Sequence, residues 1–69
     1  MLIVVSPTEV INLDNVDRIR VEYYNRDAAY LKFDSSPVKF HSRAEAEHVL
    51  TGIVDAYARG DKVFYINKE

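Results

Sequence analysis

Glu45 and His48 have the spacing that most directly suggests metal chemistry in this chain. A Glu-x-x-His pair points two ligands at one ion from a single helix face, as in di-metal carboxylate proteins. Those centres also need further carboxylates and a second helix with the same motif, whereas this sequence predicts one helix. Glu45 also fits a role as a helix cap. We therefore interpret the pair as part of a solvated helix face, and we expect neither a metal nor another cofactor.

Cations and tyrosines form a second group of candidate binding residues, on the outward parity of three neighbouring predicted strands. Its members are Arg18, Arg20, Tyr24, Tyr30, Lys32 and Lys39. Such a sheet face can hold single-stranded nucleic acid, by neutralising phosphates and stacking on bases. Glu22 interrupts the group, and the net charge of the chain is −2. We favour an oligomer interface or a solvated sheet with cross-strand pairs such as Glu22 with Lys32. Nucleic acid binding and a small-ligand surface are the alternatives.

Catalysis has no specific pattern in this sequence. The serines fall in predicted turns and caps, so none is singled out as a nucleophile. There is no glycine-rich loop to cradle a nucleotide phosphate. His41, just before the predicted helix, fits a surface or interface position. We therefore predict a non-enzymatic protein, and the alternative is a small-ligand sensor or enzyme with its site at a subunit interface.

A helix is predicted from Ser42 to Arg59, and it carries the Glu-x-x-His pair. Its first four residues form a capping box, in which the Ser42 hydroxyl accepts from the Glu45 amide and the Glu45 carboxylate reaches back. Gly60 tolerates the positive φ that ends a helix. Asp55 and Arg59 form a favourable i,i+4 pair. The apolar residues recur at a period of 3.6 and predict one buried stripe: Ala46, Val49, Leu50, Ile53, Val54 and Tyr57.

Short strands precede and follow this helix. Alternation predicts half-buried strands, with Ile19, Val21 and Tyr23 facing the helix. The apolar run 2–5 does not alternate, which indicates burial on both faces or an edge that a partner covers. The predicted strands span 2–5, 9–12, 16–24, 29–33, 38–40 and 63–66. We predict one small α+β domain over residues 1–69, an antiparallel β-meander with an amphipathic helix on one face and a short C-terminal strand.

Size makes self-association the expected state of this chain. A domain of about 60 residues buries only about 60% of its unfolded surface, and 69 residues without cysteine have no disulfide to compensate. One helix, about 10 Å wide, covers only two or three strands spaced about 4.8 Å apart. We therefore expect a homo-oligomer, first of all a dimer, that acts as a binding or adaptor module and engages no membrane. The first apolar run is too short for a signal peptide, which favours the cytoplasm.

Two segments, Ile11-Asn12-Leu13-Asp14-Asn15-Val16 and Ser42-Arg43-Ala44-Glu45-Ala46, resemble a pattern of short bacterial and phage single-domain proteins of unassigned function. Those proteins carry I-N-L-D-N-V near the start and S-x-x-E-A before the last helix, so the resemblance covers most of the chain. Some members of similar size resemble pleckstrin-homology-like sheets capped by a C-terminal helix. The predicted strand after the helix departs from that arrangement. The resemblance brings no catalytic residue to this sequence.

Overall fold

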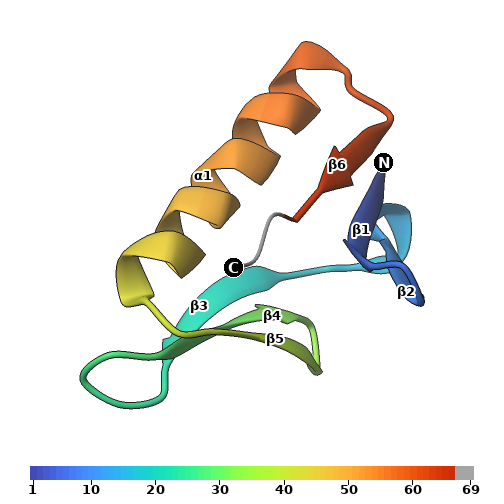
Figure 1. Ribbon diagram of the computed structural model, residues 1–69. Helices are drawn as coiled ribbons and strands as arrows, with labels where there is room; N and C mark the ends of the chain where they lie inside the picture. The colour runs from blue at the N-terminus through green and yellow to red at the C-terminus, as the bar shows by residue number, and fades with distance from the viewer. Residues whose placement is uncertain (67–69) are drawn as a thin grey trace.

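The computed structural model describes residues 1–66, and within them six strands accompany one α-helix and one short 3-10 helix. In chain order these are β1 (Leu2–Ser6), β2 (Glu9–Asn12), η1 (Leu13–Asn15), β3 (Ile19–Tyr23), β4 (Ala29–Phe33), β5 (Ser36–Phe40), α1 (Arg43–Arg59) and β6 (Val63–Tyr65). The strands form two three-stranded sheets, β2-β1-β6 and β3-β4-β5. Figure 1 shows the first half of α1 beside β3-β4-β5, and β6 returning alongside β1. The predicted α+β class is confirmed.

The sheet β3-β4-β5 is the predicted antiparallel meander. Its central strand β4 alternates fully, so that Ala29, Leu31 and Phe33 are buried while the residues between them point to the opposite face. β5 adds Val38 and Phe40 to the same buried side. This period of two is the signature of a strand with one face on a core.

The second sheet has β1 at its centre. β2 pairs with it antiparallel, with an irregular register between Val4 and Ser6, and β6 pairs with it parallel. Ile3 stands opposite Ile11 on one side and Phe64 on the other, which makes an inward apolar row. A parallel pair requires a long connection, and here that connection contains the whole β3-β4-β5 sheet and α1.

One hydrophobic core joins both sheets to α1. Its largest fully buried side chains are Phe33, Phe40, Ile3, Leu31 and Ile53. Phe64 of β6 reaches the helix at Gly52, where an added Cβ would stand 3.2 Å from the ring. Within residues 1–66 no buried side chain is polar or charged. The six strands therefore split into two sheets that curl around one helix, because a single flat sheet would extend beyond the helix width.

The apolar stripe predicted on α1 is only partly buried. The buried helical residues are Ala46, Val49, Ile53 and Ala56. Val54 and Tyr57 are 58% and 67% exposed, so the prediction that they belong to the core was wrong. The reason is angular. At about 100° per residue, Leu50, Val54 and Tyr57 form a second strip beside the buried one, and the sheets cover only the first.

The N-terminus of α1 follows its sequence signal in part. Ser42 has an extended backbone, with φ −139° and ψ 131°, and its hydroxyl accepts a hydrogen bond from the Glu45 amide. The donor and acceptor atoms are 3.2 Å apart. The reciprocal bond from the Ser42 amide to the Glu45 carboxylate is not formed within the described part of the chain. Ser42 is therefore the N-cap, and only half of the predicted capping box is present.

The C-terminus of α1 ends at the predicted glycine. Gly60 has φ 83°, in the left-handed region, and its amide donates to the Tyr57 carbonyl at 3.0 Å. Arg59 pairs with Asp61 at 2.8 Å rather than with the predicted Asp55. The reversal of the chain at Gly60 brings Asp61 back towards the last helical turn, which places its carboxylate within reach of the guanidinium.

Candidate functional site

Five of the six predicted cation and tyrosine residues come together on the side of β3-β4-β5 that faces away from α1. We call this set the basic-aromatic face: Arg20, Tyr24, Tyr30, Lys32 and Lys39. The strand register places Arg20 opposite Lys32 and Tyr30 opposite Lys39. Arg18 precedes β3 and lines a groove beside α1. The alternation of three strands therefore gathers residues that are up to 19 positions apart, from 20 to 39, on one surface.

The side chains of the basic-aromatic face already engage one another. The Glu22 carboxylate lies 3.4 Å from the Arg20 guanidinium and 3.6 Å from the Lys32 ammonium, so the predicted cross-strand pair is present. The Tyr24 and Tyr30 rings pack edge to face at 5.6 Å. The Lys39 ammonium lies 5.4 Å from the centre of the Tyr24 ring. Exposed pairs of this kind contribute little stability, but they reduce the charge that this surface offers to a phosphate chain.

A tyrosine that sequence reasoning did not single out joins the β3–β4 hairpin to the first turns of α1. Tyr23 faces the helix as predicted but is 52% exposed, and its hydroxyl donates to the Glu47 carboxylate. This hydrogen bond, and then the negative charge of Glu47, raise the pKa of Tyr23. The Arg43 guanidinium lies 4.5 Å from the ring centre and opposes the rise. Arg43 also donates to the Asn25 carbonyl at 2.8 Å, so these contacts fasten the hairpin to the helix.

The turn between β4 and β5 is fastened in a different way. Asp34 adopts φ 57°, a left-handed conformation that Asp tolerates better than most residues. Its carboxylate accepts from the Arg18 amide at 3.0 Å and from the Asp17 amide at 3.2 Å. Its own amide donates to the Arg18 carbonyl at 2.9 Å. One aspartate thus holds the chain that enters β3.

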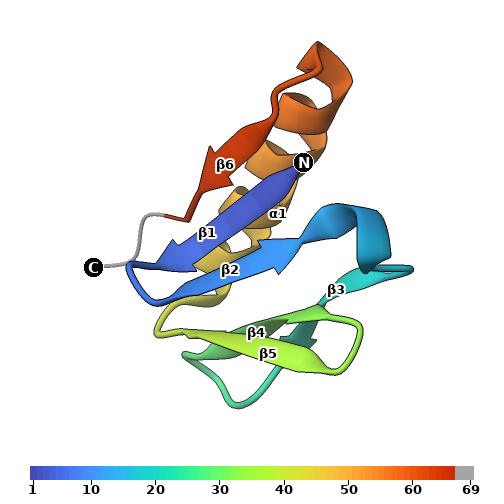
Figure 2. The same cartoon turned by 90° about the vertical axis from the view of Figure 1, so that its right-hand side faces the viewer.

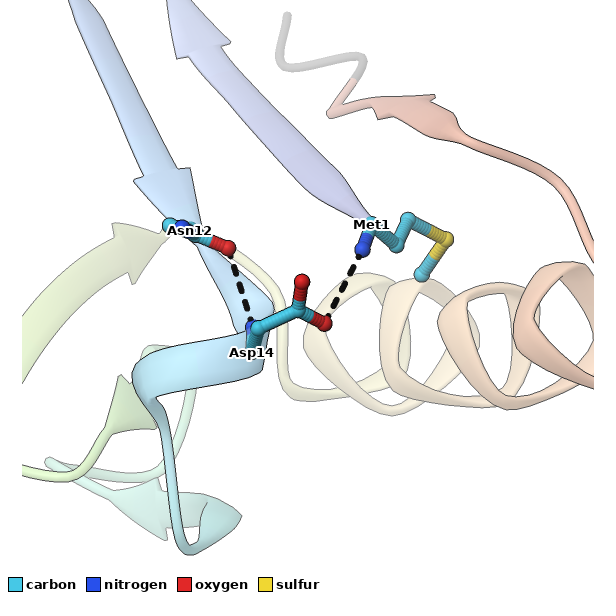
Figure 3. Close-up of polar contacts among 3 residues, drawn as sticks. All are labelled: Met1, Asn12 and Asp14. Carbon is cyan, nitrogen blue, oxygen red and sulfur yellow. Dashed lines mark hydrogen bonds and ion pairs between the residues drawn. The ribbon is translucent and has the colours of Figure 1, made fainter.

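The short helix η1 begins at Leu13, directly after its N-cap Asn12. Figure 3 shows the Asn12 side chain accepting from the Asp14 amide, at 3.1 Å, and the Asp14 carboxylate meeting the Met1 amine, at 3.3 Å. The Leu13 amide also donates to the Met1 carbonyl at 2.9 Å. These bonds are local turn and cap chemistry, and they direct the chain from one sheet to the other.

An uncovered apolar surface lies on the side of β2-β1-β6 that faces away from α1, and Figure 2 looks onto this sheet with the helix behind it. We call it the outer β1 face: Leu2, Val4, Val10, Val63 and Tyr65. Val4 stands between Val10 and Tyr65 in the register. The exposed fractions of Val10 and Tyr65 are 54% and 71%. The signal for this surface is the non-alternating apolar run 2–5, which predicted burial on both faces or cover by a partner.

A groove runs between the uncovered strip of α1 and the chain that enters β3. We call it the α1 groove, with walls formed by Leu13, Val16, Ile19, Leu50, Val54 and Tyr57. Its volume is about 540 Å³, and Asp14, Asp17 and Arg18 also line it. Sequence reasoning missed this groove because it assigned Val54 and Tyr57 to the core.

Within residues 1–66 no three or more His, Cys, Asp or Glu side chains gather closely enough to hold a metal ion. His41 and His48 are both exposed. Glu45 donates its amide to the Ser42 hydroxyl, and Glu47, which directly precedes His48, accepts a hydrogen bond from the Tyr23 hydroxyl. In the same range no helix is long and apolar enough to cross a membrane.

No protein-family model matches the chain, and comparisons with curated proteins and with solved structures also find no match. The resemblance to short bacterial and phage proteins stays a prediction. So do the single-domain assignment, the non-enzymatic character and the homo-oligomer. The candidate sites accordingly depend on the geometry above: the basic-aromatic face, the outer β1 face and the α1 groove.

Proposed function

We propose that this chain is a non-enzymatic, self-associating binding module, and that two copies meet through the outer β1 face. The observation that carries this proposal is the exposure of apolar side chains in register on all three strands of β2-β1-β6. A strand with one face in water normally alternates apolar and polar residues. β1 instead places Leu2 and Val4 outward while Ile3 points into the core.

The size of the outer β1 face suits a small dimer. Leu2, Val10, Val63 and Tyr65 are 43%, 54%, 39% and 71% exposed. At those fractions they leave on the order of 400 Å² uncovered, which is comparable to the largest apolar patch on a typical monomer. Interface cores are about 65% apolar, so an interface centred here would bury roughly 600 Å² per copy. The total for two copies, about 1,200 Å², exceeds the 1,000 Å² or so of a specific interface.

The chemistry of the outer β1 face also suits a second copy of the same chain. A two-fold axis brings the same patch of both subunits together, so a charged patch would repel itself. The five residues of this face carry no charge, and the sheet can pack on its copy as in a β-sandwich, with sheets about 10 Å apart. The partner would then cover the outer face of β1, as the apolar run 2–5 predicts. The gain is large for a domain of this size, whose own core is small.

Two charge insertions with similar starting exposure test which face associates. Val10 on the outer β1 face is 54% exposed, and Tyr24 on the basic-aromatic face is 59% exposed. Light scattering and sedimentation over a range of micromolar concentrations should give a dimer mass for the wild type and for Tyr24→Asp. Val10→Asp should give a monomer with an intact helical circular dichroism spectrum. Tyr65→Ser provides a second, milder variant with the same expected loss of mass.

Three results would reject this proposal. A concentration-independent monomer mass for the wild type would remove self-association altogether. A monomeric Tyr24→Asp together with a dimeric Val10→Asp would move the interface to the basic-aromatic face, where the sequence alone favoured it. A dimer that survives both Val10→Asp and Tyr65→Ser would also exclude the outer β1 face.

Single-stranded nucleic acid binding is a second candidate, favoured by the position of Arg20, Lys32 and Lys39 on one face with tyrosines between them. Base stacking on Tyr30 would contribute about 1–3 kcal/mol. Removing one phosphate contact would reduce the salt slope of binding by about one. Fluorescence anisotropy with a labelled oligonucleotide, at two salt concentrations, tests this function. Arg20→Ala should then weaken binding to all sequences alike, and Glu22→Gln should strengthen it. No binding at low salt excludes it.

A further inference from the structure

The second apolar strip of α1 is a surface that the fold itself leaves uncovered. The buried strip faces the sheets, whereas Leu50, Val54 and Tyr57 project beside it. Val54 and Tyr57 are 58% and 67% exposed, although both are large apolar residues on the longest element of the chain. An amphipathic helix in a small domain usually has a single apolar face that matches its cover. On α1 the apolar arc is wider than the surface that the two sheets cover.

The chain between η1 and β3 turns this strip into a groove with two walls. Leu13, Val16 and Ile19 line the groove together with the strip and Ile53, and the volume of this open groove is about 540 Å³. The opposite wall is held in place, because the Val16 amide donates to the Leu13 carbonyl at 3.1 Å and Asp34 accepts from the amides that follow. Hydrogen bonds therefore fasten one wall of the groove.

The charges around the groove sum to a small negative value. Asp14 and Asp17 line it and both are exposed, and Asp34 adds a third carboxylate behind the Asp17 amide. Arg18 is the one cation that lines it. The Met1 amine, 3.3 Å from the Asp14 carboxylate, adds a second positive charge, so three carboxylates against two cations leave this end of the groove with a net charge of −1. A partner segment with basic side chains beside its apolar ones would be complementary to it, over distances shorter than the Debye length of about 8–10 Å.

We propose that the α1 groove binds an amphipathic, basic helix of a partner protein. The uncovered strip extends from Leu50 to Tyr57, or about 10 Å along the helix axis at 1.5 Å per residue. Two turns of a docked helix present anchors at i, i+4 and i+7 over the same length. One wall is the helix α1, and in the other the amides of residues 16–18 are already hydrogen-bonded, so recognition depends on side chains. The inference is independent of the dimer, because the groove and the outer β1 face share no residue.

The probe is an acetylated and amidated peptide of about fifteen residues, near the shortest length at which an isolated helix is stable. It carries leucines at i, i+4 and i+7 with lysines between them, and its control replaces each lysine by glutamate. Amide chemical shifts of the labelled protein should move for residues 13–19 and 50–57 when the lysine peptide is added. The glutamate peptide should bind at least about tenfold more weakly.

Matched substitutions distinguish binding in the groove from nonspecific binding to other surfaces. Val54→Lys in the groove should reduce affinity for the lysine peptide at least about tenfold, whereas Tyr24→Lys, outside both the groove and the outer β1 face, should retain it, since the two side chains are 58% and 59% exposed. Asp17→Asn should weaken binding and flatten its salt dependence. No binding of either peptide, equal binding of both, or loss of binding in Tyr24→Lys but not in Val54→Lys would overturn the proposal. None of these outcomes bears on the mass measurements that test the dimer.

Discussion

Replacement of Gly52 by alanine sets two opposing effects against each other at one point of the structure. Gly52 lies in the middle of α1, where glycine costs a helix about 0.8–1.0 kcal/mol relative to alanine. An added Cβ would stand 3.2 Å from Cζ and 3.3 Å from Cε1 of Phe64, closer than the 3.5–4.0 Å or so of an optimal carbon contact. The gain in helix propensity is therefore offset by a clash with β6.

The size of the clash follows from how far the Phe64 ring must move. A retreat of a few tenths of an ångström is small, and Phe64 is half-buried in a strand of three residues. We therefore take the lower end of the overpacking range, about 1 kcal/mol. The net effect of Gly52→Ala on the free energy of unfolding should be close to zero. In a Phe64→Leu background, which lacks both ring atoms, the same change should stabilise by about 1 kcal/mol.

Urea unfolding of the four proteins, followed by helical circular dichroism at one protein concentration, measures this coupling. A single concentration is needed because a dimer would link stability to mass action. The expected coupling energy is about 1 kcal/mol, with the alanine more favourable when Phe64 is shortened. Equal stabilisation by Gly52→Ala in both backgrounds would refute the packing of β6 on α1.

Three further predictions test burial, backbone strain and ionisation. Ile53→Ala should cost roughly 2–5 kcal/mol of stability and Val54→Ala less than about 0.5 kcal/mol; similar melting temperatures for the two variants would contradict the burial of α1. Asp34→Ala should destabilise more than Asp34→Gly by about 1 kcal/mol in urea, because only alanine is strained at φ 57°. In an alkaline titration followed by phenolate absorbance, Glu47→Gln should lower the raised pKa of Tyr23 towards its ordinary value of 10.0. Since the pKa is raised in the folded state, the associated stabilisation is complete below the unfolded pKa and is lost as pH rises through the folded value.

The elements of this fold are largely predictable because their signals are local. Ser42 and Gly60 mark the ends of α1 through bonds to residues no more than four positions away. The alternation in residues 29–33 predicts the bounds of β4 without error, and the same holds for β2. The predicted strand 16–24 is shorter in the structure, as β3 (Ile19–Tyr23). Residues 16–18 do not join the strand, because Val16 caps η1 and the Asp17 amide donates to the Asp34 carboxylate, 17 residues away.

Some of the candidate surfaces were predictable from the sequence and others were not. The basic-aromatic face was predictable because a period of two within three adjacent strands needs only hairpin pairing. The uncovered strip of α1 was not, because a helical wheel does not say how much of an apolar arc the sheets will cover. The outer β1 face was only partly predictable from the sequence. Its apolar run was evident, but which of its residues point outward depends on the parallel pairing of β1 with β6.

The sequence by itself determined most of the secondary structure of this protein, the ends of its helix and the α+β class, because hydroxyl caps, glycine and apolar periodicity act over a few residues. The tertiary structure alone decided that the strands form two sheets, that Val54 and Tyr57 stay exposed, and that Tyr23 meets Glu47. Those outcomes depend on contacts between segments that are distant in the chain. Their energies are set by how two sheets and one helix share a limited core, and no local pattern encodes that division.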